Sequence, residues 1–116
     1  MRHHVTKRKL GRTRKLRTQL IRSLARSLIL HEKINTTEAR AKELRPFIER
    51  LVTKGAENTP TARRLISARL GGAQEETKKL CDSIAPRFLK RQGGYTRILK
   101  IHSGDGRALA QISFVA

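Results

Sequence analysis

The first thirty residues of the chain carry ten Lys and Arg side chains and no Asp or Glu. Like charges repel one another, and the part before Thr13 has few apolar side chains whose burial could offset the conformational entropy lost on ordering. We therefore expect residues 1–12 to form an extended basic tail and residues 13–116 to form a single globular domain. A tail of this kind indicates a polyanionic partner.

The rest of the composition narrows the class of protein further. The chain has 116 residues, a formal net charge of +18 and a single cysteine, Cys81, which excludes an internal disulfide. No apolar run approaches the roughly 20 residues that a membrane span requires. We expect a cytoplasmic protein with no membrane association, no metal ion or other cofactor and no small-molecule substrate, in which Cys81 is a small buried side chain.

Hydrophobic spacing predicts helices first and a hairpin last. A helix capped by Thr13 has leucines from Leu16 onward at spacings of three and four, so these should face the core. A short strand over residues 30–36 leads to a second helix, capped by Asn35 or Thr36, that continues through Pro46. The remaining elements are a helix from Pro60 to Gly71, a helix over residues 73–85, and strands over residues 95–102 and 109–115.

The predicted fold class is α+β with the order α-β-α-α-α-β-β. Helices and strands each have one apolar face, so the simplest solution has two layers. In it the helices pack on a small three-stranded mixed sheet, and the basic tail extends from the N-terminus.

The helix that begins after Thr13 has an unusual charge pattern. Lys15, Arg22 and Arg26 fall on the side opposite the leucines, while Arg14, Lys15 and Arg17 occupy the first turn. Basic side chains are unfavourable there because the helix dipole already places partial positive charge at that end. The pattern favours an external anion, and the alternative is a charged face that only promotes solubility.

Catalysis finds little support. The nine carboxylates show no paired or metal-binding spacing beyond helical ion-pair positions such as Glu38 with Lys42, and no nucleotide-binding glycine motif is present. Nucleic acid remains as partner, and the aromatic content of 3% is too low for a base-stacking platform. Two alternatives stay open: a DNA-compacting protein, and an RNA-processing enzyme that would use His102 or Asp105.

Several strings of residues carry a family resemblance. They are MRH at the start, KLGRT at residues 9–13, INTT at residues 34–37, RAKELRP at residues 40–46 and RQGGYTRI at residues 91–98. In these strings, and over essentially its whole length, the chain resembles the bacterial large-subunit ribosomal protein seventeen family. Family members often have Pro or Asn where Gln92 stands.

The resemblance implies a structural, non-enzymatic protein of the large ribosomal subunit. It further implies binding to folded large-subunit ribosomal RNA near the rim of the polypeptide exit tunnel, with large-subunit protein thirty-two among the neighbouring proteins.

The residues expected to contact RNA belong to three groups. For Tyr95 two alternatives remain, stacking on RNA or packing in the core after a tight turn. For Gly93 and Gly94 the expected role is close approach of the backbone to RNA. The tail supplies Arg2, His3, Lys7, Arg8, Lys9 and Arg12, the first helix supplies Arg14, Lys15, Arg17, Arg22 and Arg26, and the glycine loop supplies Arg91, Gly93, Gly94, Tyr95 and Arg97.

Overall fold

The computed structural model describes residues 13–101, 104 and 106–115. The tail residues 1–12, with the six RNA contacts predicted in them, lie outside this range. In the described part the element order is α1 (Arg14–His31), β1 (Lys33–Thr37), α2 (Glu38–Gly55), α3 (Pro60–Arg69), α4 (Gln74–Lys79), η1 (Leu80–Ile84), η2 (Ala85–Phe88), β2 (Thr96–Ile101) and β3 (Leu109–Phe114).

Helix α1 begins where the sequence predicts and ends later than expected. The Thr13 side chain accepts a hydrogen bond from the Leu16 N–H, which confirms the predicted cap. The helix continues to His31, and Glu32 follows in a left-handed conformation with a φ of 62° while its N–H donates to the Leu28 carbonyl. The strand expected at residues 30–36 is therefore shorter and begins at Lys33.

Helix α2 is a single helix that continues through Pro46, as predicted, but its cap is neither Asn35 nor Thr36. Thr37 accepts the Arg40 N–H at 3.3 Å and is the N-cap residue. Thr36 is paired with Ala110 in the sheet, so it is committed to the strand. Strand pairing, which is not visible in the local sequence, decides between adjacent capping candidates.

The two glycine-bounded helices differ in how closely they follow prediction. Helix α3 has Thr59 as its N-cap and Pro60 in its first turn, as expected. The helix expected over residues 73–85 changes character at Leu80 into a π-helical turn, in which the Ala85 N–H donates to the Leu80 carbonyl five residues back. Pro86 has no N–H to donate, and a 3-10 turn follows over Ala85–Phe88.

The sheet has the strand order β1-β3-β2 and is antiparallel throughout, so the expected mixed sheet is wrong in that respect. Strands β1 and β2 run in the same direction, but β3 lies between them, and no parallel ladder forms. Ile34, Ile112 and Ile98 pair across the three strands. The predicted apolar face of the last strand is confirmed, since Ala110, Ile112 and Phe114 are buried.

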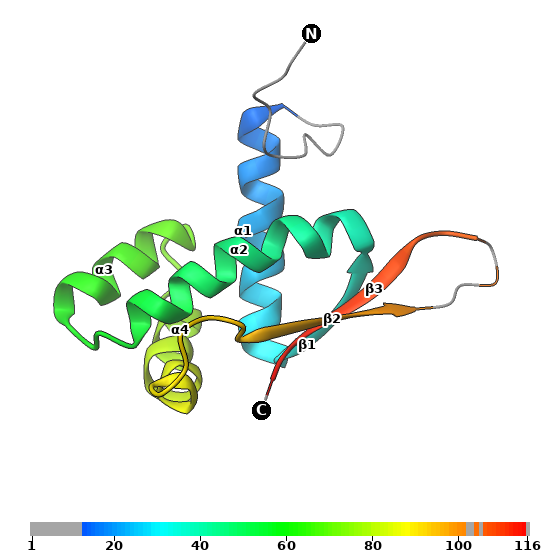
Figure 1. Ribbon diagram of the computed structural model, residues 1–116. Helices are drawn as coiled ribbons and strands as arrows, with labels where there is room; N and C mark the ends of the chain where they lie inside the picture. The colour runs from blue at the N-terminus through cyan, green and yellow to red at the C-terminus, as the bar shows by residue number, and fades with distance from the viewer. Residues whose placement is uncertain (1–12, 102–103, 105, 116) are drawn as a thin grey trace, which may run out of the picture.

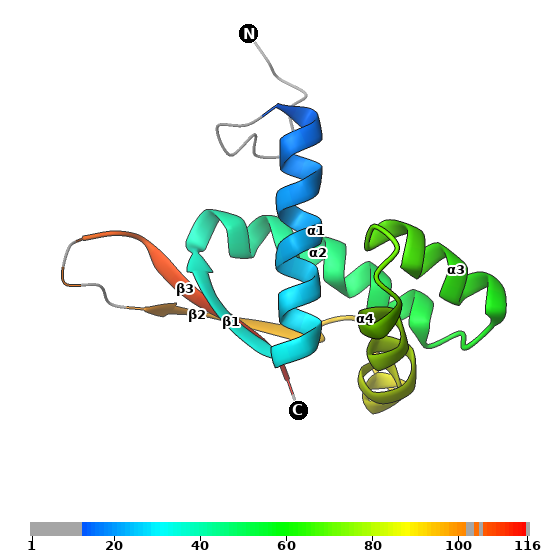
Figure 2. The same cartoon turned by 180° about the vertical axis from the view of Figure 1, so that it is seen from behind.

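The helices pack on one side of this sheet in the predicted α+β arrangement. Helix α2 lies between the sheet and the remaining helices, and α1 crosses it (Figures 1 and 2). Leu44, Ile48 and Val52 of α2 are fully buried among Leu28 and Ile112, which joins the helices and the sheet in one core. No helix in the described part of the chain combines the length and the apolar composition that crossing a bilayer requires.

Candidate nucleic-acid interface

The first turn of α1 has the charge that the sequence predicts. It contains no acidic residue, and Arg14 and Lys15 are exposed while Arg17 is half-buried. Unpaired backbone N–H groups and the helix dipole already make this end of a helix electropositive. Three basic side chains added there form a site whose natural complement is an anion such as a phosphate.

This end of α1 projects away from the rest of the domain (Figures 1 and 2). Leu16, expected in the core, is 46% exposed because the helices that bury the leucine stripe do not reach the first turns. The stripe enters the core only from Ala25 onward, with Leu28 fully buried. A projecting cationic helix can reach into a groove or between helices of a folded RNA.

Arg26 has a different surrounding from the one expected of it. Its Nη1 donates to the Leu70 carbonyl at 2.9 Å, and its side chain is half-buried. A cation at the C-terminal end of α3 is favourable because the helix dipole is negative there. A Cβ on Gly71 would lie 3.3 Å from the same Nη1 atom, so the turn after α3 packs directly against this guanidinium. The contact joins α1 to α3.

The glycine loop before β2 is open to a partner. Gly93 and Gly94 have φ angles of 91° and 66°, in the left-handed region, and a Cβ on either would meet nothing within 4 Å. Backbone conformation, rather than packing inside the chain, therefore favours glycine here. The flanking Arg91 and Arg97 side chains are exposed.

Tyr95 is a core residue, and the RNA-stacking role expected for it is corrected. Its side chain is 4% exposed, and its ring centroid lies 5.1 Å from that of Phe88. Its hydroxyl lies 3.1 Å from the Thr53 Oγ1 and donates to the Arg91 carbonyl at 3.2 Å. The ring fills the space between α2 and η2, so neither of its faces is available to a base.

The start of β2 is fixed to α2 through a buried threonine. Thr96 is 3% exposed, and both its N–H and its hydroxyl donate to the Glu49 Oε2, at 3.2 and 2.8 Å. Hydrogen bonds to a charged acceptor are among the stronger ones in proteins. Together with Tyr95 they hold the C-terminal side of the glycine loop on α2, which gives the loop a rigid base.

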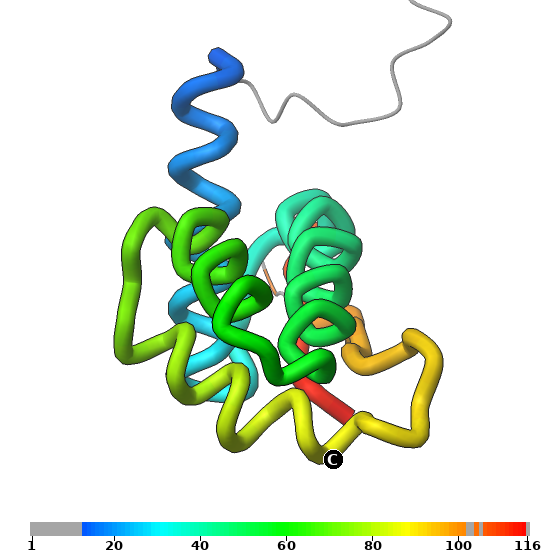
Figure 3. The backbone as a smooth tube through the Cα atoms, turned by 90° about the vertical axis from the view of Figure 1, so that its left-hand side faces the viewer, coloured from blue at the N-terminus to red at the C-terminus, as the bar shows by residue number. Residues whose placement is uncertain are grey.

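The structure does not bring all the predicted contacts into one patch. The first turns of α1 lie at one end of the molecule, and the loop before β2 lies at the other end of α1 (Figures 1 and 3). A single RNA would have to follow the surface from one region to the other, or two RNA segments would have to meet the chain separately.

A polar groove between α3 and α4 contains basic residues that sequence reasoning did not single out. Its volume is about 430 Å³. Arg63 is ion-paired with Asp82, and this hydrogen bond raises the pKa of the guanidinium. The adjacent basic pairs at residues 63–64 and 78–79 are the signal that could have indicated it. The groove is lined by Arg63, Arg64, Ser67, Gln74, Thr77 and Lys78.

The residues with most potential for chemistry are accounted for structurally. Cys81 is 3% exposed, as predicted, and burial raises the pKa of its thiol, so it is a poor nucleophile. Across residues 13–101, 104 and 106–115 no three His, Cys, Asp or Glu side chains are placed to hold a metal ion. The expected ion pair between Lys42 and Glu38 is present at 2.8 Å.

Comparison with known proteins gives one consistent result. The sequence model described as ribosomal protein L17 matches residues 20–115. A protein of Thermomicrobium roseum is 52% identical, with all of both chains covered, and one of a Hydrogenobaculum species is 48% identical, with 99% of each covered. A protein of Shouchella clausii is 47% identical, covering 92% of this chain and 97% of its own.

All three relatives are named large ribosomal subunit protein bL17, and none of these names is that of an enzyme. The match to the family extends from the middle of α1 to the end of β3, which includes every element of the core. The chain belongs to the ribosomal protein L17 family.

Proposed function

We propose that the chain binds and stabilises folded large-subunit ribosomal RNA as a structural constituent of the large ribosomal subunit, in the cytoplasm. The relatives' names support the subunit. The family resemblance supports a location near the rim of the polypeptide exit tunnel, with protein thirty-two among the neighbours.

One observation carries the RNA-binding part of the proposal. The first turn of α1 has three basic side chains and no acidic one, at the positive end of an 18-residue helix that projects from the domain (Figure 1). Local energetics disfavour such a turn, and its persistence is explained when an anion completes it. Ribosomal RNA supplies phosphates at the spacing of a polymer.

The roles of individual residues follow from where they lie. Arg14, Lys15, Arg17 and Arg22 contact phosphates together with the tail, and Arg91 and Arg97 do so at the glycine loop. Gly93 and Gly94 allow the backbone to approach RNA closely. Arg26 contributes mainly through the Leu70 carbonyl. The division into a tail of residues 1–12 and one domain of residues 13–116 is part of the same proposal.

Sucrose-gradient sedimentation of a bacterial lysate at low magnesium tests this function. The tagged chain should sediment with the large subunit and remain there through a moderate salt wash. Replacing Arg14, Lys15 and Arg17 by Gln should release the chain at lower salt, because each lost phosphate contact lowers the salt dependence of binding by about 0.7–0.9 in log–log slope.

A control variant with the same loss of charge separates these contacts from general electrostatics. Lys33, Arg64 and Lys78 are exposed and lie outside the two expected regions, so replacing them by Gln should change retention less. Sedimentation of the wild-type chain with nucleoid DNA, or at the top of the gradient, would refute the proposed function and favour the DNA-compacting alternative.

A further inference from the structure

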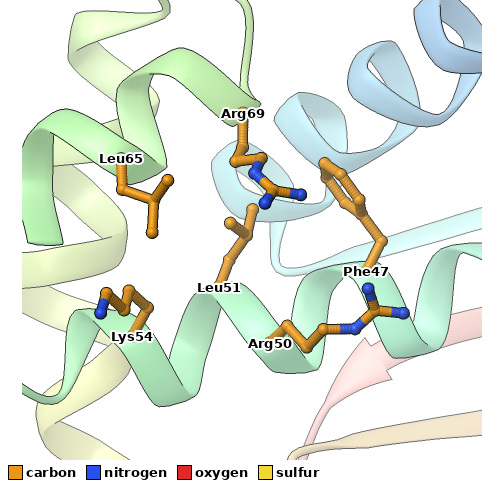
Figure 4. A pocket seen from close by; sticks show the side chains of 6 residues that line it. All are labelled: Phe47, Arg50, Leu51, Lys54, Leu65 and Arg69. Carbon is orange, nitrogen blue, oxygen red and sulfur yellow. The ribbon is translucent and has the colours of Figure 1, made fainter.

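A second surface, between α2 and α3, differs in character from the cationic regions described so far. Figure 4 shows side chains of α2 and α3 that line a shallow pocket and meet over its floor. We call it the α2–α3 groove. Its lining residues are Phe47, Arg50, Leu51, Lys54, Leu65 and Arg69.

The floor of the α2–α3 groove is apolar. Leu51 is 5% exposed, Phe47 is half-buried against the core, and Leu65 is 39% exposed although it is a large aliphatic side chain. The groove volume is about 210 Å³. Pockets for cofactors and other small ligands are usually larger, about 300–1,000 Å³. The space suits an apolar side chain of another molecule.

The rim of the groove is basic and has no carboxylate. Arg50, Lys54 and Arg69 surround the floor, and no lining side chain carries a hydrogen-bond acceptor. Lys54 pairs with Glu57 at 3.2 Å. Neither Arg50 nor Arg69 forms an ion pair with any other residue that the structure describes. The groove therefore presents unpaired donors around an apolar centre.

We propose that the α2–α3 groove binds a segment of a second protein that presents a bulky apolar side chain flanked by Asp or Glu. The apolar side chain covers Leu51 and Leu65, and the carboxylates pair with Arg50 and Arg69. Arginine near an apolar centre is typical of the residues that dominate protein interfaces. This partner is distinct from the RNA of the proposed function.

The chemistry of the lining favours protein over RNA. A base inserted into the groove would bring amino or imino donors on its edge, and the lining side chains offer no acceptor for them. An aliphatic side chain has no such groups to satisfy. Phosphates could pair with the arginines but would leave Leu65 uncovered by apolar contact.

Photocrosslinking in purified large subunits tests the proposal. The photoreactive residue p-benzoylphenylalanine replaces Thr61, which is exposed on α3 one turn before Leu65. The expected product joins the chain to a peptide in which a bulky apolar residue neighbours Asp or Glu, identified by mass spectrometry. Arg50→Glu with Arg69→Glu should lower its yield about tenfold, since charge reversal repels carboxylates.

A matched variant controls for net charge. Arg64→Glu with Lys78→Glu makes the same charge change on exposed residues outside the groove and should leave the yield unchanged. Thermal unfolding of both variants checks that each is folded. A crosslink to a nucleotide, to a peptide without carboxylates or to nothing would overturn the proposal, and so would an equal loss of yield in both variants.

A titration of the isolated full-length chain keeps this result separate from the proposed function. The probe is a peptide with one Leu flanked by Glu, and its partner probe has Ala in place of the Leu. Leu65→Ser should weaken binding of the Leu peptide about tenfold, and Leu89→Ser, at a leucine 64% exposed outside the groove, should not. No binding, or equal weakening by both variants, would contradict the groove even if the chain sediments with the large subunit.

Discussion

At the scale of single residues, conformation and surroundings separate side chains that look equivalent in sequence. Arg22 and Arg26 are one turn apart on the same face of α1, yet only Arg26 is bonded to the Leu70 carbonyl. Tyr95 stands in the middle of a string that resembles an RNA-binding loop, yet it is buried against Phe88. Tertiary contacts decided both outcomes, and neither contact has a local sequence signal.

Gly93 and Gly94 make a prediction about stability. Replacing either by Ala should lower the free energy of unfolding by roughly 1–2 kcal/mol, because an L-residue is strained in the left-handed region. Urea unfolding measures the change. Gly104→Ala is the control, because Gly104 lies outside that region and a Cβ there would also meet nothing within 4 Å. Equal stability of all three variants would show that the loop has another conformation.

The same loop allows a separate test of close approach to RNA. Gly94→Val should reduce incorporation into large subunits by more than Gly94→Ala does, because the larger side chain stands further from the backbone where RNA would lie. Sedimentation of the two variants after matching for folded protein measures this. Normal incorporation of Gly94→Val would refute the close-approach role.

At the scale of elements, α1 is held to the helical segment after α4 by one ion-pair cluster. Glu32, just after α1, is paired with Arg87, and with Lys79 at 3.5 Å. Lys79 also donates to the Leu30 carbonyl at 2.7 Å. These contacts fix the point at which α1 ends and β1 begins, so they explain why the strand starts later than the sequence pattern predicts.

This cluster predicts an acid-dependent loss of stability. The hydrogen bond from Arg87 is the largest cause that lowers the pKa of the Glu32 carboxyl below its usual 4.5. A carboxyl whose pKa is lower in the folded state stabilises above its unfolded pKa, and this contribution is lost as pH falls through the folded value. Glu32→Gln should therefore cost up to about 1 kcal/mol at neutral pH, since the pair is partly exposed, and almost nothing in acid.

Urea unfolding midpoints across the acid range measure this effect. The difference between wild type and Glu32→Gln should shrink as the pH falls below about 4.5, whereas Glu75→Gln, at an exposed glutamate of α4, should show no comparable trend. A constant difference at every pH would mean that Glu32 acts through its size or backbone conformation rather than its charge.

At the scale of the whole molecule, the sequence predicted the elements better than their relations. Thr13, Thr59 and the terminal hairpin were found because capping and alternation are local signals. The cap at Thr37 and the antiparallel sheet depend on which strands pair. Leu16 is exposed because the fold ends before it, and that is set by the packing of distant helices.

The candidate interface was predictable to a similar degree. Charge along the first helix and the glycine pair indicated two cationic regions, and both are exposed in the structure. Their separation along the molecule could not be read from the sequence, nor could the α2–α3 groove, whose lining comes from two helices. Both features arise only when the chain folds.

The central claim is that the projecting end of α1 lies against ribosomal RNA. Thr18 is exposed there, one turn after Arg14, so p-benzoylphenylalanine at Thr18 in purified large subunits should report what this end touches. The account predicts a crosslink to large-subunit ribosomal RNA, reduced when Arg14, Lys15 and Arg17 are replaced by Gln. Crosslinks only to protein, or none in subunits that contain the chain, would contradict it.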